Sequence, residues 1–211
     1  MTVRLPSFSK MNLPRLKELA RYPGLVLASG SPRRRKILEE IGIDFEVVVP
    51  QIDEDDDSNG RPDELAVKLA GRKVLSVNHD EKRFYLGCDT IVVYDRKILM
   101  KPRDEADALR ILTLLSGRTH SVFTGLALHD SRSRQWLTGV EESRVKFNPW
   151  PEAKLREYIA TGEPLDKAGA YGIQGMGRFL VDTVEGNIDN VIGLPLSTLE
   201  HLASHCRGRY A

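Results

Sequence analysis

Near its N-terminal end the chain places serines, a glycine and arginines directly after a short apolar segment, a combination that could bind phosphate. Residues 25–28 read as a strand, residues 29–32 form a turn of small residues, and residues 33–35 are arginines that open a helix. Gly30 lets the backbone approach an anion closely, and Pro32 fits the first helical turn. The helix N-terminus would then face a phosphate with free N–H groups and its positive dipole end. The same turn also fits a serine N-cap before a basic helix that binds no ligand.

Three further residues stand where the apolar pattern of the chain breaks. Asp89 and Thr90 lie inside an otherwise apolar segment, and Lys101 directly precedes a proline in a short basic stretch. A carboxylate near a strand end can hold a metal ion or deprotonate water, and a lysine can bind phosphate. Each residue also has a structural interpretation: Asp89 as a turn cap, Thr90 as an ordinary β-branched strand residue and Lys101 as a solvated loop residue.

A glutamine in a glycine-rich loop is the residue best suited to recognise a base. Gln174 lies within residues 165–175, a loop too polar for a core, and Gly172 and Gly175 flank it. Its amide carries both a donor and an acceptor, as does the edge of uracil or thymine, so it could recognise a pyrimidine. A loop amide that braces its own backbone is the alternative.

Four segments in this order, residues 25–35, 87–93, 100–103 and 165–175, resemble the motifs of the Maf family of nucleoside triphosphate pyrophosphatases. The resemblance extends from about residue 25 to the C-terminus. It implies an enzyme that hydrolyses dTTP, UTP and modified pyrimidine nucleoside triphosphates to the monophosphate and pyrophosphate. It also implies a divalent metal cation, Mg²⁺ or Mn²⁺, and members of the family are often homodimers.

The resemblance assigns roles to individual residues. It makes Asp89 the general base and, together with Glu54, a ligand of the metal. In the family, preference for dTTP and UTP goes with the residues that match Arg33, Thr90 and Gln174. The substrate-binding candidates are then Ser29, Ser31, Arg33, Arg34, Lys73, Thr90, Lys101 and Gln174. Glu54 lies in a run of five carboxylates, residues 53–57, most of which we expect to be a solvated loop.

A second class of function stays open beside the enzyme. The family's original name suggests a regulator of septum formation, which would bind nucleotide or nucleic acid without turnover. Asp89, Lys101, Glu54 and Gln174 occur together in this chain. This combination favours the enzyme, because binding alone would not need a base and metal ligands.

Composition limits the remaining possibilities. The chain has 211 residues, 41% of them hydrophobic, which suffices for a sizeable core in one domain or two closely joined lobes. Its 31 basic and 30 acidic residues give a net charge of +1, which argues against a protein that coats nucleic acid. Cys88 and Cys206 form no CxxC motif. Polar residues interrupt residues 1–22, and no apolar run could span a bilayer, so we expect no membrane segment and a cytoplasmic location.

The order of elements predicts an α/β fold with a mixed, twisted sheet and flanking helices. Gly42 is expected to end the helix that the arginines open, and Asp104 to cap the start of a later helix. Residues 1–24 are predicted to be an extension that contains a short helix, and residues 25–211 the Maf-like domain. Residues 62–78 read as a helix that buries Leu65, Leu69 and Val74 and presents Lys73 to its polar side. The segment 119–129 is apolar on both faces, typical of a central strand, and residues 178–184 read as a further strand. The resemblance narrows the fold to the Maf-like one, related to the inosine triphosphatases, with a cleft between two lobes.

Overall fold

The computed structural model describes residues 3–21, 24–52, 60–79 and 83–206. These residues divide into two compact units. Unit 1 takes its described residues from Met1–Pro6, Thr90–Phe123 and Glu142–Ile192, and unit 2 takes them from Ser7–Asp89, Thr124–Glu141 and Gly193–Ala211. No helix within the described part of the chain is long and apolar enough to cross a membrane.

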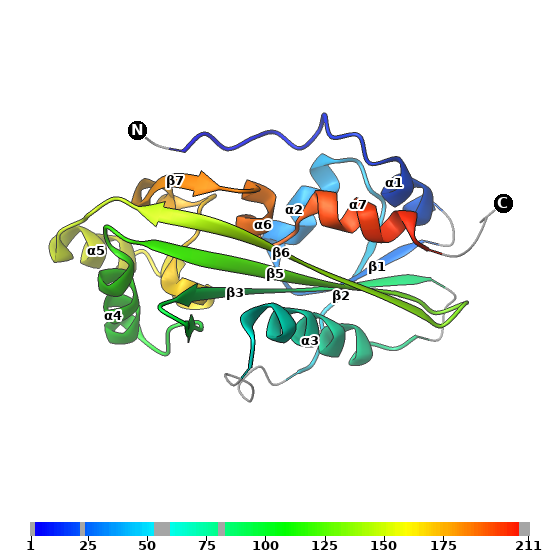
Figure 1. Cartoon of the computed structure of the whole chain (residues 1–211), viewed down its shortest axis with the longest axis horizontal. Coiled ribbons are helices and arrows are strands. Elements are labelled where there is room, and N and C mark those ends of the chain that lie inside the picture. Colours follow the sequence, from blue (N-terminus) through cyan, green and yellow to red (C-terminus); the bar gives the residue numbers. More distant parts are fainter. Residues whose placement is uncertain (1–2, 22–23, 53–59, 80–82, 207–211) are drawn as a thin grey trace. The chain divides into compact units, whose positions relative to one another are not determined.

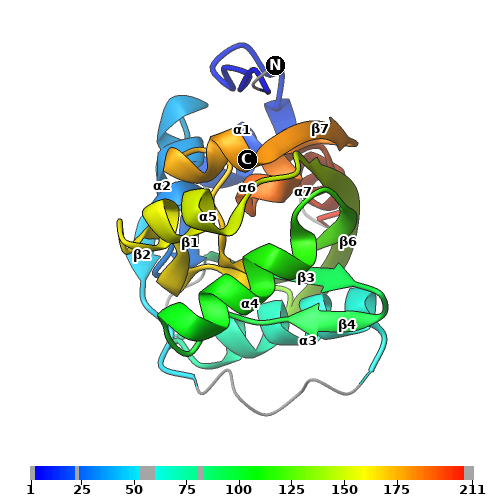
Figure 2. The ribbon, with the colours of Figure 1, turned by 90° about the vertical axis from the view of Figure 1, so that its left-hand side faces the viewer.

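The strands form one mixed sheet in the order β2-β1-β3-β5-β6-β7 (Figure 1), with β4 paired to β3 beside this path (Figure 2). Their bounds are β1 (Leu25–Ala28), β2 (Glu46–Val48), β3 (Phe84–Tyr94), β4 (Lys97–Leu99), β5 (Thr119–Asp130), β6 (Gln135–Phe147) and β7 (Val181–Glu185). Strand β1 runs parallel to β2 and β3, whereas the β3–β4 and β6–β7 pairs are antiparallel. The predicted α/β class with a mixed sheet is confirmed, and the apolar strand β5 lies inside the sheet as its pattern indicated.

In unit 2, helix α3 lies on the sheet at a distance that only glycine permits. The helices of this unit are α1 (Pro14–Arg21), α2 (Pro32–Glu40), α3 (Pro62–Leu75) and α7 (Leu196–Ser204). A Cβ added at Gly87 of β3 would lie 2.1 Å from the carbonyl oxygen of Ala70, and one at Gly125 of β5 would lie 2.2 Å from Ala66. Leu65, Leu69 and Val74 are buried as predicted. Lys73 is buried as well, so its expected position on the polar side of the helix is wrong.

Helix α2 begins and ends where the sequence indicated. Pro32 occupies its first turn after Ser31, whose side chain makes no cap hydrogen bond. Gly42, with φ of 71°, follows the last turn, a position where a left-handed conformation favours glycine. Helix α1 packs against α7, and Figure 1 shows the two side by side.

Unit 1 holds most of the short helical segments. They are α4 (Glu105–Leu115), α5 (Glu152–Ile159), α6 (Ile188–Ile192) and the 3₁₀ turns η1 (Glu163–Asp166), η2 (Ala168–Ala170) and η3 (Met176–Leu180). Helix α4 packs against α5 (Figure 2). The side chain of Asp104 accepts a hydrogen bond from the Asp107 N–H at 2.7 Å, which is the N-cap expected for α4. Residues 178–180 belong to η3 rather than to the predicted strand, because the Arg178 N–H bonds to the Gly175 carbonyl and closes a turn.

Candidate nucleotide site

The turn after β1 is held by a buried arginine of α2. The Arg34 Nη1 donates a hydrogen bond to the Ser29 hydroxyl at 3.0 Å, and its Nε donates to the Gly193 carbonyl at 2.7 Å. The backbone N–H of Ser31 also donates to the Ser29 hydroxyl, at 3.2 Å. A serine hydroxyl accepts about two hydrogen bonds and donates one. Since Ser29 accepts from two protein donors, what it can offer a ligand is its O–H, which suits an acceptor such as a phosphate oxygen.

The three arginines that open α2 differ in exposure. Arg34 is buried, Arg33 is half-buried, and Arg35 is exposed. Successive residues of a helix point in different directions, so some side chains in a run of arginines face the protein interior and others face solvent. Arg33 and Arg34 therefore stay candidates for a phosphate, with Arg34 already fixed in position by its two partners.

A buried ion pair joins α3 to β3. The Lys73 Nζ donates a hydrogen bond to Asp89 Oδ1, and the two side chains are only 8% and 11% exposed. Removing one partner of such a pair leaves an uncompensated buried charge, which typically costs about 3–5 kcal/mol. The Asp89 carboxylate is thus fixed by its buried ion pair with Lys73, and it is not the cap of a solvated turn.

The buried thiol of Cys88 is affected by the charges of Arg34 and of the Lys73–Asp89 ion pair. Burial raises the pKa of its thiol to about 11, while the charges of Arg34 and Lys73 lower the pKa and that of Asp89 raises it. Ala28 of β1 pairs with Gly87 of β3, so the turn that begins at Ser29 follows the strand directly beside the one that carries Cys88 and Asp89. The predicted residues that the structure brings together here are Ser29, Arg34, Lys73 and Asp89.

Of the other predicted residues, Ser31 and Arg33 lie in unit 2, three lie in unit 1, and one lies outside the described residues. Thr90 follows Asp89 along β3 and is half-buried, and Lys101 is exposed in the segment after β4. Gln174 is half-buried in the loop between η2 and η3. Glu54 lies outside the residues that the structure describes.

The side chains around Asp89 can be compared with the ligands that a divalent metal ion requires. Within the described ranges, no group of three or more His, Cys, Asp or Glu side chains could hold a metal ion. Asp89 supplies one buried carboxylate, and Mg²⁺ is commonly bound by one or two carboxylates together with substrate phosphates and water. The residues present thus fit a metal that is held jointly with a nucleotide.

Sequence reasoning missed two side chains that organise the loop around Gln174. The Glu163 carboxylate accepts the backbone N–H groups of Met176 and Gly177, and the Tyr158 hydroxyl accepts that of Gly172. The signal available in the sequence was the glycine spacing of the loop, which indicates close contacts without identifying the partners. The Gly193 carbonyl that holds Arg34 was also missed, because a backbone acceptor 159 residues away leaves no mark in the sequence.

Comparison with known proteins places the chain among a group of relatives. Residues 24–206 match the family model described as Maf-like protein. The dTTP/UTP pyrophosphatase of Dictyoglomus turgidum is 45% identical over 180 residues, which cover 84% of this chain and 93% of that protein. The dTTP/UTP pyrophosphatase of Acetivibrio thermocellus is 45% identical over 186 residues, covering 84% and 92%. The solved structure of the Staphylococcus aureus Ham1 protein aligns with 58% of this chain and 71% of its own, at a TM-score of 0.41 and 14% identity.

Proposed function

This chain belongs to the Maf-like protein family, and from that premise we propose that it hydrolyses dTTP and UTP to the nucleoside monophosphate and pyrophosphate. Its relatives named dTTP/UTP pyrophosphatase make it a nucleoside triphosphate pyrophosphatase. The observation that carries the proposal is the buried group of Ser29, Arg34, Lys73 and Asp89 in unit 2. It combines donors for phosphate with one carboxylate, which is what cleavage of a phosphoanhydride requires.

Asp89 is the general base in this proposal. Lys73 holds Asp89 Oδ1, so we assign the proton of the attacking water to Oδ2. As that proton moves to Asp89, the water oxygen forms a bond to the α phosphorus of the nucleotide. The bond from the α phosphorus to the bridging oxygen breaks, and its electron pair leaves with pyrophosphate. General-base catalysis of this kind contributes about 10²- to 10⁴-fold to a rate.

Basic side chains stabilise the leaving group. The oxygens of pyrophosphate gain charge as the bond opens, so preorganised cations near them lower the barrier. We assign this role to Arg33, Arg34 and Lys101, and phosphate binding to Ser29 and Ser31. Mg²⁺ or Mn²⁺, held by Asp89 and Glu54, would neutralise phosphate charge and polarise the phosphoryl oxygens when bound.

Gln174 and Thr90 are the residues we assign to recognition of the pyrimidine. The amide of Gln174 can donate to one atom and accept from another on the edge of uracil or thymine. Its half-buried position leaves part of the side chain accessible to a ligand.

Labelled water tests where the bond breaks. With H₂¹⁸O, divalent metal and dTTP or UTP, we expect nucleoside monophosphate and pyrophosphate in equal amounts, with the label in the monophosphate. Label in pyrophosphate, or early nucleoside diphosphate with orthophosphate, would contradict attack at the α phosphorus. Nucleotide binding without any product would instead favour the regulator.

A further inference from the structure

Two side chains of unit 1 accept hydrogen bonds from the backbone on both sides of Gln174 and so fix the loop that carries it. Glu163, at the start of η1, accepts the Met176 N–H at 2.7 Å and the Gly177 N–H at 3.1 Å. On the other side of Gln174, the Tyr158 hydroxyl accepts the Gly172 N–H at 3.2 Å. The Tyr158 hydroxyl itself donates to Glu163 Oε1 at 2.9 Å, so the two side chains form one connected unit. We call Tyr158 and Glu163 the loop clasp.

The glycines of the loop make this contact possible. A Cβ at Gly175 would lie 2.3 Å from Glu163 Oε2, and one at Gly177 would lie 2.4 Å from the Tyr158 hydroxyl. The glycine spacing of the segment is therefore explained by the close approach of its backbone to the loop clasp.

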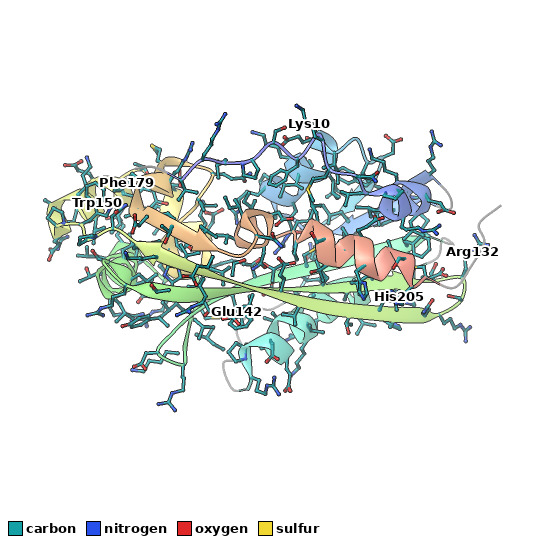
Figure 3. All side chains as sticks on the ribbon, turned by 45° about the horizontal axis from the view of Figure 1, so that its top comes forward. Lys10, Arg132, Glu142, Trp150, Phe179 and His205 are labelled. Atoms are coloured by element: carbon teal, nitrogen blue, oxygen red, sulfur yellow. The ribbon has the colours of Figure 1, made fainter. Side chains whose placement is uncertain are left out.

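The loop clasp is itself held firmly. Tyr158 is 3% exposed and packs against Phe179 with ring centroids 5.8 Å apart. Phe179 in turn lies beside Trp150, as the labels in Figure 3 show, with centroids 5.0 Å apart. Burial and the adjacent Glu163 raise the pKa of Tyr158, so its hydroxyl stays protonated and keeps donating to the carboxylate. The Lys167 Nζ donates to the Glu163 carbonyl at 2.6 Å and fixes the backbone of η1.

We propose that Glu163 and Tyr158 are positioning residues for substrate selectivity, which set the Gln174 amide at the angle needed to meet a pyrimidine edge. Gln174 lies two residues from Gly172 and two from Met176, both of which are anchored, so little freedom of the backbone remains between them. A binding group that is held in position before the ligand arrives loses less entropy on binding. The inference rests on the proposed role of Gln174.

Glu163→Gln is the direct test, because it keeps the size of the side chain and removes the charge that accepts these N–H groups. We expect KM for dTTP and UTP to rise about tenfold, an energy of about 1.4 kcal/mol, with kcat and the KM for purine triphosphates within about twofold. Tyr158→Phe, which removes a single hydroxyl, should act in the same direction. In both variants the amide hydrogens of residues 172, 176 and 177 should exchange faster.

Glu157→Gln is the matched control. Glu157 lies on the same helix as Tyr158, and its ion pair with Lys154 is exposed, so this change should leave selectivity unaltered. A second comparison places Glu163→Gln in the Gln174→Ala background, where a positioning role predicts no further loss of selectivity.

The outcomes separate this inference from the proposed function. Equal loss for all nucleotides, unchanged selectivity, or a full Glu163→Gln effect in the Gln174→Ala background would each overturn the positioning role. Unaltered protein that fails to turn over dTTP and UTP would overturn the proposed function, and this selectivity argument with it.

Discussion

At the scale of single residues, Asp89 is the side chain on which the proposed reaction depends most. Asp89→Asn keeps the shape and an oxygen for Lys73 to contact, and it removes the base and one negative charge. We expect kcat for dTTP to fall on the order of 10²- to 10⁴-fold in a protein that still melts cooperatively. Asp95→Asn makes the same chemical change at an exposed turn and should leave kcat unaltered. A folded Asp89→Asn variant with normal kcat would exclude Asp89 as the base.

His120 gives the fold a dependence on pH. Its Nε2 lies 2.9 Å from the Tyr171 hydroxyl, and burial lowers its pKa from 6.5 to about 3. Between these values the unfolded chain binds a proton that the folded chain excludes, so stability is lost as pH falls below about 6.5. The loss approaches about 1.4 kcal/mol for each pH unit. In denaturant titrations from pH 7 to pH 4.5, His120→Gln should show a shallower decline than the unaltered protein, and identical slopes would contradict this account.

The sequence identified several site residues but not their contacts. Ser29 and Arg34 stood out because they directly follow an apolar segment, and Asp89 because it interrupts one; all three are buried in unit 2. Lys73 was expected on the polar side of its helix because a lysine is rarely buried without a partner. Its partner Asp89 lies 16 residues away on a different element, and the spacing of apolar residues along a helix does not reveal contacts with another element.

At the scale of elements, the sequence predicted boundaries well where local chemistry sets them. Pro32, Gly42 and Asp104 each mark an end of a helix as expected, because a cap or a fixed φ depends only on neighbouring residues. Residues 178–180 were predicted as the start of a strand over residues 178–184. They belong to η3 instead, because the Arg178 N–H closes a turn onto the Gly175 carbonyl and Glu163 accepts the N–H of the preceding Gly177, contacts that only the folded loop supplies.

Because α3 packs closely on the sheet, we expect alanine to destabilise the protein at one glycine and to stabilise it at another. Gly87→Ala would place a methyl group 2.1 Å from the Ala70 carbonyl oxygen, and backbone cannot yield as a side chain can. We expect a loss of about 1–3 kcal/mol or more in the free energy of unfolding. Gly71, inside α3, has no neighbour within 4 Å of an added Cβ, so Gly71→Ala should stabilise by about 0.5–1 kcal/mol. Equal effects of the two changes in chemical denaturation would contradict this packing.

At the scale of the whole molecule, residues 3–21 lie before the segment that matches the family model, yet their apolar side chains are part of the core. Phe8, Leu13, Leu16 and Leu19 are all buried. The Glu200 carboxylate on α7 accepts the N–H groups of Arg15 and Leu16, each at 2.9 Å, and so satisfies donors at the start of α1. Residues 7–21 of the extension are therefore packed within unit 2, although none of the predicted site residues belongs to them.

Deletion of residues 1–24 separates stability from catalysis. Each fully buried apolar side chain contributes up to about 1.5–3 kcal/mol, so the truncated chain should unfold at a clearly lower temperature. Its kcat for dTTP should stay within about twofold when it is assayed well below that temperature, because the proposed phosphate site begins only after β1.

Leu16→Ala is the matched control, since it removes packing from the same interface and leaves the chain intact, at an expected cost of about 2–5 kcal/mol. The extension also reaches α2, where Glu40 accepts hydrogen bonds from the Ser7 hydroxyl and the Phe8 N–H at 2.9 and 2.8 Å. A truncated chain that melts cooperatively but has lost activity, beside an active Leu16→Ala variant, would therefore mean that this contact sets the position of the helix that carries Arg33 and Arg34.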